Sequence, residues 1–173
     1  MTSLLHKMHD FTRVETIYRK KLKTVRLKIQ RDYTASPHIK LHTVTTPYDV
    51  HEVLKAIYAT LDDDQEHVVL LILNAAQEIT GYKLIASGGQ EYALTDAKIL
   101  FRNALLLGAS GIIMAHNHPT GELDPSEYDI EITKKMVAGG QTLDIEVVDH
   151  IIYTAHGYAS LRKVVPAIFE DEE

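Results

Sequence analysis

Residues 111–129 read G-I-I-M-A-H-N-H-P-T-G-E-L-D-P-S-E-Y-D, and the rest of the fold has to be arranged around this stretch. Its first five residues are an apolar run rich in β-forming residues, which predicts a buried strand that ends at His116. His116 and His118 are two positions apart, so on an extended segment their imidazoles point to the same side. A following helix can bring back the carboxylate of Asp129. The spacing therefore predicts a metal site.

Two histidines and one aspartate leave a fourth position open on a tetrahedral ion, which is typical of a catalytic rather than a structural zinc. The chain has no cysteine, so the metal has to be held by nitrogen and oxygen donors. We therefore predict one Zn²⁺ per chain, held by His116, His118 and Asp129. The plainer alternative is a histidine-rich loop followed by an ordinary capped helix.

The dipeptide Asp124-Pro125 predicts the N-cap and the first residue of that helix. Asp129 would then lie in the second turn, near the positive end of the helix, and Gly139-Gly140 would end it. Ser126 precedes Asp129 by three residues, so the two share a helix face. Its hydroxyl could donate to an oxyanion beside the metal, and we expect Ser126 to be a catalytic residue.

The pattern H-x-H-P-x6-S-x2-D resembles the JAMM signature of the JAB/MPN metalloprotease superfamily. The longer run N-A-L-L-L-G-A-S-G-I-I-M-A-H-N-H-P-T-G, with V-V-D-H-I-I-Y-T downstream, resembles the bacterial RadC-like branch. The similarity covers about residues 62–163, with Thr120 where this branch usually has serine. It implies a mixed α/β fold, one zinc on two His and one Asp, and hydrolysis of peptide or isopeptide bonds.

The resemblance also implies a water-polarising glutamate just before the first core strand, and the matching residue is Glu66. It opens the apolar run His67–Leu73, which predicts a buried strand, so its carboxylate can reach a site at the sheet edge. Glu78, on the next strand, and Glu91, in a glycine-flanked loop, are alternative general bases. The plainer interpretation is that Glu66 ends the acidic run 62–64 as a solvated loop residue.

Other segments predict the scaffold. Helices are expected from Pro47 to Leu61 and from a Thr95-Asp96 cap to Leu107, and strands at 67–73, 78–86 and 144–154. Asp149 and His150 are neighbours on the last strand, so they point to opposite faces and are not both metal ligands. We therefore expect His150 to be structural, or to support a ligand from behind.

Composition limits the class of protein. With 173 residues, 45% of them hydrophobic and 24% charged, the chain fits one globular domain. We expect an α/β fold, a single MPN/JAB-like domain over residues 46–163 with a mixed β-sheet flanked by helices. A basic N-terminal extension (1–45) would precede it and an acidic tail (164–173) would follow. No run approaches 18 apolar residues and no signal peptide is evident, so we expect a cytoplasmic protein without membrane contact.

Charge is divided unevenly along the chain. The first 45 residues contain ten Lys and Arg against three Asp and Glu, whereas the remainder contains eight against twenty-one. The basic segment includes an alternating stretch, 23–30, which predicts a strand. It could contact nucleic acid, dock on an acidic partner or cover the acidic core. A solvated helix with a lysine-protected edge strand is the plainer interpretation.

Three functions remain open. The first is a zinc hydrolase that cleaves a peptide or protein conjugate with Glu66 and a zinc-bound water. The second is a DNA-associated, DNA repair-type RadC-like protein that binds or processes nucleic acid through residues 1–45. The third is a catalytically silent MPN scaffold. The single-metal layout and acidic core disfavour the second, and the complete ligand set disfavours the third. The sequence does not indicate an oligomeric state.

Overall fold

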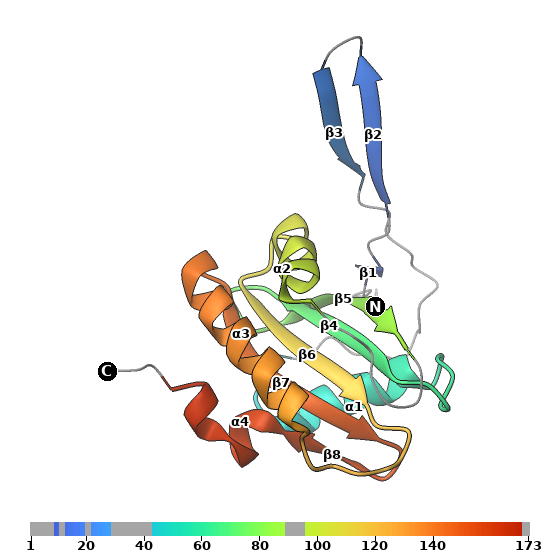
Figure 1. Cartoon of the computed structure of the whole chain (residues 1–173), viewed down its shortest axis with the longest axis vertical. Coiled ribbons are helices and arrows are strands. Elements are labelled where there is room, and N and C mark those ends of the chain that lie inside the picture. The colour runs from blue at the N-terminus through green and yellow to red at the C-terminus, as the bar shows by residue number, and fades with distance from the viewer. Residues whose placement is uncertain (1–8, 11–12, 20–21, 29–42, 89–95, 171–173) are drawn as a thin grey trace, which may run out of the picture.

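The computed structural model describes residues 9–10, 13–19, 22–28, 43–88 and 96–170, those before residue 43 as backbone only (Figure 1). The main sheet has six strands in the order β1-β5-β4-β6-β7-β8, and β2 and β3 form a separate pair. The strands are β1 (His9–Asp10), β2 (Arg13–Arg19), β3 (Leu22–Lys28), β4 (His67–Leu73), β5 (Ile79–Ser87), β6 (Gly111–Asn117), β7 (Glu146–Thr154) and β8 (Gly157–Ser160). The helices are α1 (Pro47–Tyr58), α2 (Ala97–Leu106), α3 (Glu127–Leu143), α4 (Leu161–Val164) and the 3₁₀ helix η1 (Pro166–Ile168).

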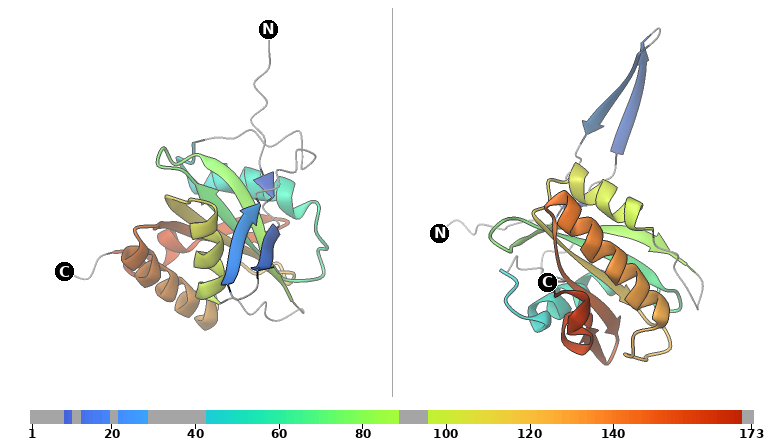
Figure 2. Two further views of the ribbon diagram at one scale, coloured as in Figure 1. Left: turned by 90° about the horizontal axis from the view of Figure 1, so that it is seen from above. Right: turned by 60° about the vertical axis from the view of Figure 1, so that its left-hand side comes forward.

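Helices cover both faces of the main sheet, which gives three layers (Figures 1 and 2). Helix α1 packs on the face that presents Val69 and Leu71 of β4. Helices α2 and α3 cover the other face, where Leu70 and Ile72 point. All seven residues of β4 are therefore buried, which explains its uninterrupted apolar sequence. The predicted fold class, a mixed sheet flanked by helices, is confirmed.

The segment β6–α3–β7 determines where the candidate ligands lie. Strands β6 and β7 are parallel neighbours at the centre of the sheet, whereas β4 runs antiparallel to β6. A parallel pair needs a crossover, and α3 supplies it. The chain therefore leaves the C-terminal end of β6 at His116, passes through a loop and enters α3 close to that same strand end.

The predicted boundaries of α3 are wrong at both ends. The helix begins after Ser126, which is the N-cap, and not after Asp124. It continues through Gly139-Gly140 to Leu143 and ends at Asp144, which has the left-handed φ of 54°. Gly140 serves packing instead of termination, because a Cβ there would lie 2.4 Å from the carbonyl oxygen of Ile145.

The other predicted elements are largely confirmed. Strand β4 has the predicted bounds, α1 has a Thr46 N-cap, and α2 has an Asp96 N-cap with Gly108 at φ 67° beyond its end. The sequence did not predict the seven-residue strand β2 or the shorter elements β1, β8, α4 and η1. Ile168, in the segment expected as an acidic tail, is buried.

The basic segment contributes strands β1, β2 and β3. Strand β1 pairs in parallel with β5 and extends the main sheet, whereas β2 and β3 pair with each other and stand away from it (Figure 1). The domain boundary at residue 45 stays a prediction.

Within the described parts of the chain, every helix is too short or too polar to cross a bilayer.

Candidate metal centre

The three predicted ligands converge at the C-terminal end of β6. Nε2 of His116 lies 2.9 Å from Nε2 of His118 and 3.2 Å from Oδ1 of Asp129. Nε2 of His118 lies 3.8 Å from Oδ2 of the same carboxylate. Ligands of a tetrahedral zinc, at bonds of about 2.0–2.1 Å, are about 3.3 Å apart. We call these three residues the ligand triangle, and its spacing and its nitrogen and oxygen donors fit such an ion.

Burial determines the protonation of the deepest ligand. His116 is 1% exposed, and desolvation lowers its pKa to about 4, although the Asp129 carboxylate opposes the shift. His118 contributes a smaller lowering of the pKa. Near neutral pH the His116 imidazole is therefore uncharged, which is the form that ligates a metal.

Asp129 is held by the start of its own helix. Its backbone N–H donates to Oγ of Ser126 at 3.2 Å, and its Oδ2 accepts from the backbone N–H of Ser126 at 2.8 Å. Together these bonds form a capping box. Oδ2 is anchored by the cap, so Oδ1 is the oxygen that faces His116.

Ser126 has a different hydrogen bond from the one that the sequence suggested. Its hydroxyl donates to Oδ2 of Asp129 at 2.6 Å. The single hydroxyl proton therefore fixes the carboxylate and does not point to an open position beside the triangle. The oxyanion role of Ser126 stays a prediction that requires this hydroxyl to turn, and the structure instead supports a role in positioning Asp129.

A test of that positioning role is the Ser126→Ala variant. We expect it to lose about 0.5–2 kcal/mol of the free energy of unfolding, the usual cost of removing an N-cap. Zinc affinity should fall as well, because Oδ2 of Asp129 loses its hydroxyl donor. The matched control is Thr46→Ala, which removes the equivalent cap of α1 and should leave zinc affinity unchanged. Equal zinc affinity in both variants would contradict the role.

Glu66 lies at the end of β4 that is nearest to the ligand triangle. Val68, two residues further along the chain, pairs with His116 on the neighbouring strand β6. The Glu66 backbone is held on both sides by Asn117, whose Oδ1 accepts from His67 N–H at 2.7 Å and whose Nδ2 donates to the Gln65 carbonyl at 2.8 Å. Asn117 has no separate signal in the sequence, because it is a polar residue between two candidate ligands.

The alternative bases lie elsewhere. Glu78 is exposed and follows the turn at the opposite end of β4, where its carboxylate accepts from Asn74 at 2.8 Å. The two ends of this seven-residue strand are about 20 Å apart. That distance disfavours Glu78 as a base at the triangle. Glu91 lies outside the described residues, and the role of Glu66 stays a prediction.

Buried polar side chains lie behind His116, on the Nδ1 side of its ring. Nδ1 of His116 lies 2.8 Å from Nε2 of His150, and Nδ1 of His150 lies 2.6 Å from Oγ1 of Thr133. His116, Asp129 and His150 also form a group of potential metal ligands whose donor atoms lie within 4.8 Å of one another. Nε2 of His150, however, faces Nδ1 of His116, whereas Nε2 of His118 faces Nε2 of His116, the same atom that lies near Asp129. We therefore favour His118 as the third ligand.

Asp149 confirms the expected alternation on β7. It points away from His150 and accepts hydrogen bonds from Oγ of Ser160 at 2.6 Å and from the backbone N–H of Arg162 at 3.1 Å. Burial raises the pKa of its carboxyl group, and these bonds oppose the shift. Asp149 therefore anchors the β8–α4 connection and takes no part in the triangle.

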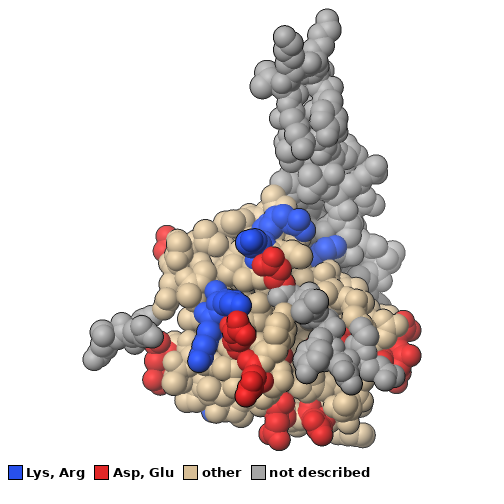
Figure 3. Space-filling view, in the orientation of Figure 1, with Lys and Arg blue, Asp and Glu red and all other residues tan. Residues whose placement is uncertain are grey.

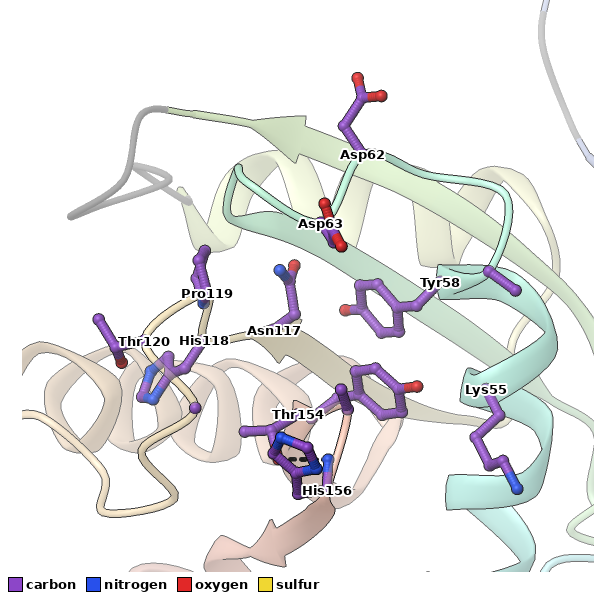
Figure 4. A pocket seen from close by; sticks show the side chains of 14 residues that line it. Lys55, Tyr58, Asp62, Asp63, Asn117, His118, Pro119, Thr120, Thr154 and His156 are labelled. Carbon is purple, nitrogen blue, oxygen red and sulfur yellow. Dashed lines mark hydrogen bonds between the residues drawn. The ribbon is translucent and has the colours of Figure 1, made fainter.

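A cleft of about 390 Å³ adjoins the triangle through His118 (Figure 4). His118 and Pro119 form one side, and Tyr58 and Asp63 lie across from them. The Tyr58 ring stacks on that of Tyr153 at 4.6 Å between centroids. Burial raises the pKa of Tyr58 well above its usual value, with a further contribution from the Glu66 charge, so Tyr58 stays neutral. The cleft can hold a few residues of an extended chain beside the metal centre.

Comparison with known proteins assigns most of the chain to one family. The family described as RadC-like JAB domain matches residues 44–165. A UPF0758 protein of Flavobacterium johnsoniae is 34% identical over 134 residues, which cover 78% of this chain and 58% of the relative. A UPF0758 protein of Carboxydothermus hydrogenoformans is 35% identical over 133 residues, 77% of this chain and 58% of that protein. The chain thus matches little more than half the length of these relatives, and their names state no activity.

Proposed function

Because the chain belongs to the RadC-like JAB domain family, as the sequence resemblance indicated, and its ligand triangle borders a cleft, we propose that it is a zinc-dependent hydrolase. The bond that we assign to it is a peptide or isopeptide bond, which the resemblance to JAMM metallopeptidases implies. The observation that carries the proposal is the triangle itself. The two histidine Nε2 atoms lie 2.9 Å apart, and the Asp129 carboxylate lies 3.2 Å from His116 through Oδ1 and 3.8 Å from His118 through Oδ2. The cleft adjoins this triangle at His118.

Each part of the site has its own role in the proposed hydrolysis. When bound, zinc supplies a Lewis acid and lowers the pKa of its water to about 7. Glu66 accepts the proton of the attacking water and passes it to the leaving amine. His116, which is neutral, and His118 both turn Nε2 toward the triangle, and the capping box holds Asp129 opposite them. The cleft beside His118 orients the substrate chain.

Metal analysis combined with a substrate screen tests the proposal. The purified protein should contain one zinc per chain and cleave a member of a panel of unstructured peptides and lysine-linked protein conjugates. A chelator should abolish this activity, and added zinc should restore it. Full zinc content without cleavage of any panel member would favour the silent scaffold. Metal bound elsewhere, with the triangle free, would contradict the proposed site.

The basic composition of residues 1–45 favours a second candidate function, nucleic-acid binding. On the face that Figure 3 shows, the described Lys and Arg side chains lie next to Asp and Glu side chains. Nζ of Lys135, for example, lies 2.6 Å from Oε1 of Glu131. Any nucleic-acid contact would therefore depend on the N-terminal segment. We expect binding that weakens steeply as salt rises in a DNA shift assay. The absence of a shift at low salt would end this candidate.

A further inference from the structure

Behind the ligand triangle, a chain of hydrogen bonds runs from His116 through His150 and Thr133 back to Asp129. The distances are 2.8 Å from Nδ1 of His116 to Nε2 of His150, and 2.6 Å from Nδ1 of His150 to Oγ1 of Thr133. Oγ1 of Thr133 in turn lies 2.5 Å from the backbone carbonyl oxygen of Asp129. This series of hydrogen bonds joins β6, β7 and α3, and it begins and ends on candidate metal ligands.

The direction of each hydrogen bond follows from the last one. Two oxygen atoms approach to 2.5 Å only with a hydrogen between them, and the carbonyl of Asp129 has none to give. Thr133 therefore donates to that carbonyl and has no second proton. Nδ1 of His150 must then carry the hydrogen that it shares with Thr133.

The hydrogen on Nδ1 of His150 in turn determines which nitrogen of His116 carries a hydrogen. A neutral imidazole carries one N–H, so His150 with a hydrogen on Nδ1 has an acceptor at Nε2. Nδ1 of His116 then donates to it, which leaves Nε2 of His116 with a free lone pair. That lone pair is on the atom 3.2 Å from Oδ1 of Asp129 and 2.9 Å from Nε2 of His118.

Burial keeps water away from these hydrogen bonds. Thr133 and His150 have an exposed fraction of 0% and His116 of 1%. Water can therefore not replace any member of the chain, and a broken link leaves a buried polar group without a partner. A metal-ligating histidine whose other nitrogen is held in this way has its ring orientation and tautomer fixed before the ion arrives.

We propose that His150 and Thr133 are positioning residues that select the metal-binding tautomer of His116. Thr133 acts through His150 without touching the metal or a substrate. The proposal rests on the zinc ligand set of the proposed function but not on hydrolysis. It also assigns His150 a role other than that of a fourth ligand.

The test compares Thr133→Val, Thr133→Ser and Thr142→Val in the 173-residue chain. Thr142 is the matched control, because its hydroxyl also donates to the carbonyl four residues back, that of Ala138, but it is exposed and far along α3. Zinc affinity is measured by competition with a chromophoric chelator. We expect the Kd to rise about 10–100-fold in Thr133→Val, the usual effect of losing an outer-shell partner. It should stay near the wild-type value in Thr133→Ser and Thr142→Val.

A second readout follows the tautomer directly in the zinc-free protein. Imidazole ¹⁵N shifts of His116 should show hydrogen on Nδ1 and a bare Nε2 in the wild type and in Thr133→Ser. In Thr133→Val, a population with hydrogen on Nε2 should appear. An unchanged tautomer in Thr133→Val with unchanged zinc affinity would overturn the proposal.

His150→Gln separates positioning from ligation. It should bind zinc more weakly but still to one ion per chain at saturating metal. A complete loss of the metal, as expected for a ligand, would overturn the proposal and make His150 a ligand. If the wild type binds no zinc, the proposed function fails, whereas the ¹⁵N shifts of the zinc-free chain still decide the tautomer question.

Discussion

Glu66→Gln is expected to reduce hydrolysis by about 10²–10⁴-fold, the usual contribution of a general base, with zinc content and thermal stability unchanged. Glutamine has nearly the same size as glutamate and can still hydrogen-bond a water. It cannot accept that water's proton or pass it to a leaving amine. A small residual rate is allowed, because zinc alone maintains some hydroxide near neutral pH.

The measurement is the steady-state rate on the substrate found by screening, with zinc content determined on the same sample. Glu78→Gln is the matched control, because Glu78 is exposed at the far end of β4 and should be replaceable without loss of activity. Full activity in Glu66→Gln would show that another residue is the base. Loss of zinc with activity would show that Glu66 is a ligand.

Asp129→Ala is expected to abolish zinc binding and activity together. The variant removes one of three donors and leaves the buried His116 beside an empty position. We expect zinc affinity to fall by more than about 100-fold, the upper end for an outer-shell partner. The His116→Ala/His118→Ala double variant should likewise contain no zinc. Metal analysis after dialysis, followed by titration with zinc, measures the loss.

The structure offers a matched control for the capping role of Asp129. Asp49 occupies the same N3 position in the capping box of α1, and its Oδ2 accepts from the backbone N–H of Thr46 at 2.8 Å. Asp49→Ala should therefore lose a similar free energy of unfolding and keep its zinc. If Asp129→Ala retained full zinc content while losing only stability, the ligand assignment would be wrong.

Local signals in the sequence were sufficient for most of the scaffold. Residues 68–73 are apolar throughout because both faces of β4 are covered, and the predicted bounds His67–Leu73 are those of the strand. Asp96 caps the start of α2 through its side chain, which accepts from the backbone N–H of Lys98 at 2.9 Å, and Gly108 follows the end of the helix with a left-handed φ of 67°. These signals need no knowledge of distant neighbours.

The two ends of α3 differ from the prediction for different reasons. Asp124-Pro125 and Ser126 with Asp129 are both good helix starts, and in the structure the second pair forms the capping box. Gly140 looks like a helix stop, but its missing side chain instead admits the carbonyl of Ile145. Close packing of α3 on β7 therefore overrode the local preference of glycine.

The sequence by itself was enough to predict the candidate ligand set, because His116, His118 and Asp129 lie within one short motif whose spacing reflects strand and helix periodicity. Only the tertiary structure decided how Ser126, His150 and Thr133 serve that set. His150 is 34 residues from His116 along the chain, and its hydrogen bond exists because β6 and β7 are parallel neighbours covered by α3. The physical reason is that a motif encodes side-chain direction locally, whereas a buried hydrogen bond requires a partner that only the sheet and helix packing can supply.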